Sequence, residues 1–399
     1  MKILSIAMAT IALALSSFIT NASESTELAE LKRELTQIKE QLAKDSAAKE
    51  ASIKVGGAVR FQYTINDYKD GDKDRGGDFD FDVFRLDFNG TVGDIILSAQ
   101  YRWYQYMDAI HHAYVAYQFD ENLQGQVGIT QVPFGNLTYN SNSFFFSTNF
   151  YVGLEDDYDA GLSFIGDYDK HDIRIAFFKT DEMGGIDGFV GNKNDRYSYD
   201  IVGTRKAGED LYDTPQQGLA DDSTFNLRYA YKFDNFEVGA SLLSGDIEGE
   251  EGNAGEHNAY ALHTKGNIDN FGFMFQYTDY EYDLDDKSDF VTVGAYAFYD
   301  TIPASAKIYN LNLSYSVPVE FGPITNLKFY NDYSLMTDKS GGLKEDTLMN
   351  VTGVMVTSGN LYTLIDYAMG KNQPFIGGSL AGDSDEINNR LNINFGYYF

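Results

Sequence analysis

The stretch "NRLNINFGYYF", residues 389–399, alternates apolar and polar side chains up to its final residue. Its apolar positions are Leu391, Ile393, Phe395, Tyr397 and Phe399. Because successive side chains of a strand point to opposite faces, this segment has one apolar face and one polar face. In a soluble sandwich the apolar face would pack on a second sheet, whereas in a transmembrane barrel it would contact lipid.

The same period of two recurs along the chain from Ile53 onward. Examples are "AVRFQYTI" (58–65) and "DIILSAQYRWYQY" (94–106), and the runs have roughly the 9–11 residues that cross a bilayer as a tilted strand. No stretch beyond the N-terminus approaches the ~20 consecutive apolar residues of a transmembrane helix. We therefore predict an all-β fold, an antiparallel transmembrane β-barrel over residues 52–399.

The connections between these runs alternate between short turns and long acidic or glycine-rich loops. The short turns are at 92–94, 120–122, 234–236, 269–271 and 358–360. Short turns at one rim and long loops at the other are typical of outer-membrane barrels. This pattern favours the barrel over the alternative, a secreted β-sandwich.

The number of strands follows from a parity argument. A direct count of runs gives seventeen, but bacterial single-chain barrels have an even number of strands. The weakest run is 289–304, which contains a proline and follows an acidic stretch, so we assign it to an external loop. Residues 318–325 then form a periplasmic turn, and the prediction is sixteen strands, with eighteen as the alternative. The last strand pairs with the first, which leaves no open edge in the membrane.

The N-terminal part of the chain differs from the rest. A short basic start, an apolar stretch and small residues near Ala22 predict a signal peptide over 1–22, with a membrane anchor as the alternative. Residues 23–51 carry an a/d seam of a coiled coil, which predicts a short periplasmic helix. The seam consists of Leu28, Leu31, Leu35, Ile38 and Leu42. An isolated helix of this length has little stability in water, so we expect it to associate with further copies of the chain into a homotrimer. The alternative is an amphipathic helix that lies on a surface.

Composition excludes several classes of function. The formal net charge of -30 argues against nucleic acid as a partner, because a phosphate backbone attracts a basic surface. The chain has no cysteine, so it has neither disulfides nor thiolate metal sites. The expected partners are outer-membrane lipid and lipopolysaccharide, further copies of the chain, and small polar or anionic solutes.

One region carries a resemblance to a known family. The segment "AYVAYQFDENLQGQVGITQVPFGNLTYNSNSFFFSTNF" (113–150) resembles the phosphate-selective porins (O and P type) of Gram-negative outer membranes, and 84–92 is similar to their second strand. The resemblance implies a trimeric barrel whose third loop, here 130–158, folds into the pore and narrows it. The residues it places in this constriction loop are Pro133, Phe134, Gly135, Asn136, Asn140 and Asn142. Residues 130–158 contain no Lys or Arg, which departs from the family and argues against tight phosphate binding.

The phase of each strand predicts which charges line the channel. The basic residues expected to face the lumen include Arg60, Arg85, Arg102, Arg174, Arg228, Lys232 and Arg390. The acids on the same phase are fewer: Asp87, Glu237, Asp332 and Asp366. The arginines have two alternative roles: they attract passing anions, or they pair with these acids and stiffen the wall. The sequence favours neither role over the other. Most of the remaining acidic residues lie in the segments 154–159, 245–257 and 279–289, which predicts an acidic outer rim of the barrel.

No motif points to a metal, a cofactor or catalysis. The acidic segment 67–78 fails the EF-hand pattern, because Arg75 and Phe81 stand where that loop needs Gly and Glu. His111 and His112 are adjacent in a strand and are expected to face opposite sides. The sequence therefore predicts a passive channel in the Gram-negative outer membrane, weakly anion-selective, without enzymatic activity. The alternatives are a cation-preferring pore and a structural or adhesive barrel.

Overall fold

A computed structural model describes residues 33, 36–37, 39, 52–205, 209–215 and 217–399. The chain divides into two units, 1–52 and 53–399, and each is considered by itself. Of the predicted signal peptide and coiled coil, only four residues are described, all helical: Arg33, Thr36, Gln37 and Lys39. Both predictions otherwise concern residues outside the described part of the chain. Among the described residues, no helix combines the length and the apolar character needed to cross a membrane.

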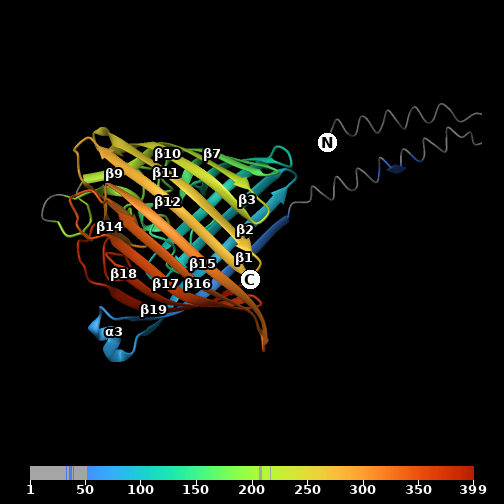
Figure 1. Cartoon of the computed structure of the whole chain (residues 1–399). Helices are drawn as coiled ribbons and strands as arrows, with labels where there is room; N and C mark the ends of the chain where they lie inside the picture. The colour runs from blue at the N-terminus through green and yellow to red at the C-terminus, as the bar shows by residue number, and fades with distance from the viewer. Residues whose placement is uncertain (1–32, 34–35, 38, 40–51, 206–208, 216) are drawn as a thin grey trace, which may run out of the picture. The chain divides into compact units, whose positions relative to one another are not determined.

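The second unit is a closed antiparallel β-barrel of sixteen strands (Figure 1). Each strand of the wall pairs with its neighbours in the ring. The strands are β1 (Ser52–Asn66), β2 (Asp78–Val92), β3 (Ile95–Tyr104), β4 (Asp108–Gln118), β5 (Leu123–Gln131), β6 (Tyr158–Tyr168), β7 (His171–Thr180), β9 (Gln217–Lys232), β10 (Phe236–Gly249), β11 (Gly252–Ile268), β12 (Phe271–Leu284), β15 (Ser305–Phe321), β16 (Ile324–Thr337), β17 (Thr347–Ser358), β18 (Leu361–Lys371) and β19 (Asn388–Tyr398). The predicted strand number is confirmed.

The first and last strands close the ring. β1 and β19 pair antiparallel from Ala58 opposite Tyr398 to Asn66 opposite Arg390. The pairing leaves neither strand with an open edge, which a barrel wall in lipid requires. The segment quoted first is therefore a wall strand, and the prediction that it pairs with the start of the barrel is confirmed.

Three further strands lie outside the wall. They are β8 (Asp200–Thr204), β13 (Phe290–Ala295) and β14 (Phe298–Pro303). β13 and β14 form a hairpin that also pairs with β8, and Val291, Val293 and Ile302 are fully buried there. The segment 289–304 is thus correctly excluded from the wall, but it is a packed hairpin and not a solvated external loop. Its apolar alternation is satisfied by packing against other loops.

The two faces of the wall have opposite chemistry. On β19, Asn392 and Asn394 are 0% and 2% exposed, whereas Phe395 and Tyr397 are 40% and 50% exposed. The same inversion holds on β3, where Ser98 is buried and Leu97 is exposed. Apolar side chains outside and polar ones inside are the reverse of a soluble fold and fit a barrel that contacts lipid.

The two ends of the barrel differ as predicted. Short turns join β2 to β3, β4 to β5, β9 to β10, β11 to β12 and β17 to β18. The long connections gather at the opposite end, where β14 and the helix α3 (Asp70–Arg75) are found in Figure 1. They include the β5–β6 connection, residues 132–157, which we call L3 and which contains the short 3-10 helix η1 (Phe150–Val152).

Candidate pore constriction

L3 crosses the barrel interior and is fixed to the opposite wall by two carboxylates. The backbone N–H groups of Asn142 and Ser143 each donate to Asp332 Oδ2 at 2.7 Å, and Asn142 Nδ2 donates to Asp332 Oδ1 at 2.8 Å. The N–H of Phe144 donates to Asp366 Oδ2 at 3.1 Å. Asp332 and Asp366 are 2% and 0% exposed, so two of the four inward acids predicted from sequence are occupied by the loop.

The start of L3 is fixed to a second part of the wall. Gly135 N–H donates to Ser241 Oγ at 3.0 Å, and Asn136 N–H donates to Gln276 Oε1 at 2.8 Å. Gly135 has φ 63°, and a Cβ there would lie 2.2 Å from Gln276 Oε1. Only glycine fits this close approach with positive φ. The carbonyl of Gly135 accepts a 2.7 Å bond from Arg228 Nε.

Glu155 organises the inside of the loop. Its carboxylate accepts the backbone N–H groups of Asn140 at 2.8 Å and Ser147 at 3.0 Å, and the Ser147 hydroxyl also donates to it. Burial raises the pKa of Glu155 to about 7, although these hydrogen bonds act in the opposite direction. The folded shape of L3 thus depends on one buried acid as well as on its anchors to the wall.

The structure places five of the six predicted constriction residues away from open space. Pro133, Phe134, Gly135, Asn136 and Asn140 are buried. Asn136 Nδ2 donates to Asn140 Oδ1 at 2.9 Å, so these amides connect parts of the loop to each other. Asn142 alone of the six lines a cavity. The cavity-facing residues of L3 are Tyr139, Ser141, Asn142, Ser143, Phe144, Phe145, Phe146, Phe150 and Tyr151.

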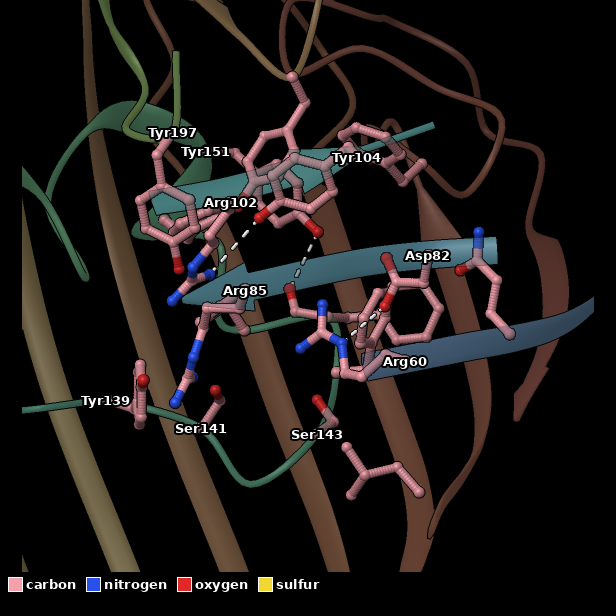
Figure 2. Close-up of a pocket in the computed structure, with 18 of the residues that line it drawn as sticks. Arg60, Asp82, Arg85, Arg102, Tyr104, Tyr139, Ser141, Ser143, Tyr151 and Tyr197 are labelled. Atoms are coloured by element: carbon pink, nitrogen blue, oxygen red, sulfur yellow. Dashed lines mark hydrogen bonds and ion pairs between the residues drawn. The ribbon is translucent and has the colours of Figure 1, made fainter. Parts of the chain in front are cut away.

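A cavity of about 830 Å³ lies between L3 and the wall formed by β1, β2, β3, β17, β18 and β19. Four predicted lumen residues line it: Arg60, Arg85, Arg102 and Arg390. Asp82 is the one acidic residue among the lining residues that the structure describes. In Figure 2, Arg60, Arg85 and Arg102 project from their strands on the side of the cavity that faces the L3 residues Tyr139, Ser141 and Ser143.

The four arginines differ in their acidic partners. Arg60 pairs with Asp82 at 2.7 Å, and Arg85 pairs with Asp87 at 2.7 Å. Within the described chain, Arg102 and Arg390 form no ion pair with a carboxylate; their bonds are to neutral groups. Arg102 donates to Gln100 Oε1 at 2.6 Å and to the Tyr104 hydroxyl at 3.4 Å.

Arg390 likewise bonds only neutral acceptors, the Phe375 carbonyl at 3.1 Å and Asn392 Oδ1 at 3.0 Å. The pairing of lumen arginines with acids is thus observed for Arg60 and Arg85, and the attraction of anions stays a prediction. The other two, Arg102 and Arg390, have no carboxylate within ion-pair distance in the described chain.

Each of these arginines also lies against an aromatic ring. Guanidinium-to-centroid distances are 4.3 Å for Arg102 over Tyr197, 5.3 Å for Arg390 over Phe145, 5.5 Å for Arg60 over Phe144 and 5.2 Å for Arg85 over Tyr398. An aromatic face holds a guanidinium in place without neutralising it. The wall charges are therefore fixed in position and remain positive.

Three predicted lumen residues lie outside this cavity. Arg174 is paired with Asp172 at 3.1 Å and lines neither cavity. Lys232 lines a second cavity of about 390 Å³ beside the short turns, and Asn142 lines both cavities, so L3 separates them. Arg228 is 1% exposed and lies beneath L3, which corrects its predicted place on the pore surface.

Arg228 has a structural role that predicts a large loss of stability on mutation. Besides Gly135, it bonds Asp172 at 2.8 Å and Glu237 at 2.7 Å. In Arg228→Met, Asp172 keeps its pair with Arg174 and Glu237 keeps Lys265 at 3.8 Å, but the hydrogen bonds that Arg228 donates to both carboxylates are lost. We therefore expect a loss of about 1.5–3 kcal/mol in the free energy of unfolding. Denaturant unfolding in detergent, followed by fluorescence of Trp103, measures it. Lys179→Met, which breaks an exposed pair, is the control, and equal losses in both variants would contradict the anchoring role.

Sequence reasoning missed the aromatic part of the cavity. Tyr104, Tyr197, Tyr296 and Phe298 line it and come from β3, the β7–β9 loop and the β13–β14 hairpin. Tyr104 lies on the polar phase of its strand, which was a usable signal. The other three belong to loops, whose side-chain directions follow no period.

Two sequence motifs turn out differently in three dimensions. A β-bulge in the β3–β4 pairing leaves His111 without an opposite residue, so His111 and His112 face the same side and contact each other at 2.9 Å. The expectation that they face opposite sides is therefore wrong. Within the acidic segment 67–78, residues 70–75 form the helix α3 instead of a calcium loop.

The predicted acidic rim also needs a correction. Glu155, Asp156, Asp157 and Asp159 are 3–6% exposed, so the 154–159 acids lie inside the molecule and not on its rim. Much of 245–257 belongs to β10 and β11, which extend to the turn at 250–251.

Comparison with known proteins supports the fold. No family model matches the sequence, and no curated protein matches it. Among solved structures, the chain is similar to the trimer form of OmpT, an outer membrane protein of Vibrio cholerae, with a TM-score of 0.55 and 13% identity over 88% of this chain and 99% of that chain. It is similar to an anion-selective porin from Comamonas acidovorans, with a TM-score of 0.56 and 12% identity over 88% and 100% of the two chains.

Salmonella typhi OmpF, in a complex with daunomycin, is similar to the same degree, with a TM-score of 0.56 and 12% identity over 87% and 97% of the two chains. The chain has the porin fold. At these identities the likeness concerns the fold alone, and the resemblance to the phosphate-selective family stays a prediction.

Proposed function

We propose that the protein is an outer-membrane diffusion channel of a Gram-negative bacterium, working as a homotrimer and passing small polar solutes with a weak preference for anions. The observation that carries the proposal is the large cavity, which four arginines and one carboxylate line. Fixed charges of one sign at the narrow part of a channel bias which ions enter. Because each such charge is worth only ~1 kcal/mol at 4 Å in water, the preference is weak.

The lining argues against a site dedicated to phosphate. L3 brings no cation to the cavity; its contribution is hydroxyls, one amide and a row of phenylalanines, Phe144, Phe145 and Phe146. Removing water from a small, strongly hydrated anion requires several donors to replace it. The wall arginines offer donors, but Arg60 and Arg85 already pair with acids and the aromatic faces offer none. The lining therefore suits anions with an apolar part better than inorganic phosphate. No catalytic step is proposed.

Current through planar lipid bilayers tests the proposal. The purified chain is expected to produce stepwise, ohmic conductance, with closures in groups of three if the trimer is the working unit. A barrel with a structural or adhesive role, filled by its loops, would insert and pass no current. That result would overturn the channel proposal.

A further inference from the structure

Three carboxylates from two segments of the chain meet where L3 joins β6. Asp157 is the last residue of L3, Asp159 lies on β6, and Asp200 begins β8. One oxygen from each lies within 4.8 Å of the others. They are 6%, 6% and 4% exposed, respectively. Buried acids this close together are costly unless protons or a cation reduce their charge.

The surroundings provide little positive charge. Arg196 bonds Asp200 at 2.6 Å, but the same guanidinium also bonds Asp181 at 3.1 Å and lies 3.5 Å from Glu182. The charged neighbours that act most strongly on Asp159 are all acidic: Asp157, Asp200, Asp221 and Glu182. His257 lies close by, with its Nδ1 3.7 Å from Asp221.

An independent observation points to a missing ligand. Oδ1 of Asp159 is fully buried and has no hydrogen-bond partner in the described chain. Buried polar atoms are almost always paired, so an unpaired carboxylate oxygen inside an acidic cluster indicates a group that binds there. The carboxylate of Asp157, in contrast, accepts the N–H of Tyr158 at 2.9 Å.

We propose that Asp157, Asp159 and Asp200 bind a calcium ion. Calcium takes oxygen ligands at about 2.3–2.6 Å, so two ligands on opposite sides of the ion are roughly 5 Å apart. The observed separations, all within 4.8 Å, are therefore compatible with one calcium ion shared by the three oxygens. The ligand set is entirely carboxylate oxygen, which suits calcium better than softer metals.

The ion connects two parts of the interior. It ties the junction of L3 and the wall strand β6 to β8, which pairs with the inner hairpin through β13. Calcium thus completes, from the other side, the anchoring of L3 that Asp332 and Asp366 provide at its tip. This inference does not require the channel to be anion-selective, or to conduct at all.

Calorimetric titration of calcium into the EDTA-treated full-length protein in detergent tests the site. The wild type is expected to bind one calcium ion per chain above the weak background of the surface acids. Asp159→Asn and Asp200→Asn are expected to weaken this binding at least about tenfold, since even residues that only support a ligand cost that much. Asp283→Asn, which removes an exposed acid paired with Lys287, is the control and leaves the binding unchanged.

If the variants do not fold, the melting temperature of the wild type in calcium is compared with its melting temperature in EDTA. A higher melting temperature in calcium supports the site. If the wild type binds calcium no more tightly than Asp159→Asn and melts at the same temperature in EDTA, the carboxylates share protons instead and the proposal is overturned.

Discussion

Asp332→Ala is expected to release the tip of L3 and to raise the single-channel conductance and its noise. The carboxylate accepts three hydrogen bonds from Asn142 and Ser143, and no other acid contacts these two residues in the described chain. Hydrogen bonds to a charged group contribute about 1.5–3 kcal/mol each. Losing even ~3 kcal/mol lowers the ratio of anchored to released loop by roughly 100-fold.

The conductance is expected to rise, and not to fall, because of the position of Asn142. This residue lines both cavities, so its displacement joins them into a wider path. Asp332→Asn keeps one acceptor oxygen and should give a smaller increase than alanine. Asp279→Ala removes an equal charge from the outer face of β12, where the carboxylate bonds the Tyr260 hydroxyl, and serves as the control. A conductance of Asp332→Ala equal to that of Asp279→Ala would show that L3 does not limit the path.

Much of the wall could be predicted from the sequence because it depends on local periodicity. The period of two places Arg60 and Asn392 inside and Phe395 outside without knowledge of any partner strand. The same reasoning fails wherever the register shifts. One bulge residue changes the face of everything after it, so His111 and His112 could not be assigned correctly from alternation.

The interior could be predicted far less well, for a physical reason. An inward-facing side chain can meet water, an ion partner or a folded loop, and periodicity does not distinguish these. Arg102 and Arg228 have the same phase and the same chemistry, yet one lines the cavity and the other lies under L3. Their environments differ because the Gly135 carbonyl accepts a hydrogen bond from Arg228 and not from Arg102. That contact depends on how L3, which is remote in sequence from Arg228, crosses the barrel.

The paired substitution Arg102→Gln and Arg390→Gln is expected to move the reversal potential in a salt gradient towards cation preference. These are the two cavity arginines that form no ion pair in the described chain, so their removal takes away positive charge without leaving a paired carboxylate behind. At ~1 kcal/mol per charge, the ratio of anion to cation permeability should fall by up to about fivefold for each residue. Glutamine keeps hydrogen-bonding capacity and much of the side-chain length, which limits other changes.

Ionic strength gives this prediction an internal check. The screening length is about 10 Å at 0.1 M salt and about 3 Å at 1 M, so the difference between variant and wild type should shrink at high salt. Arg102→Lys keeps the charge and loses the planar stacking on Tyr197, and it should retain most of the anion preference if charge is what matters. Lys179→Gln removes an exposed charge outside both cavities and should leave the reversal potential unchanged. An unchanged reversal potential in the double variant at low salt would mean that ions do not pass these arginines, and the selectivity proposed for the cavity would have to be abandoned.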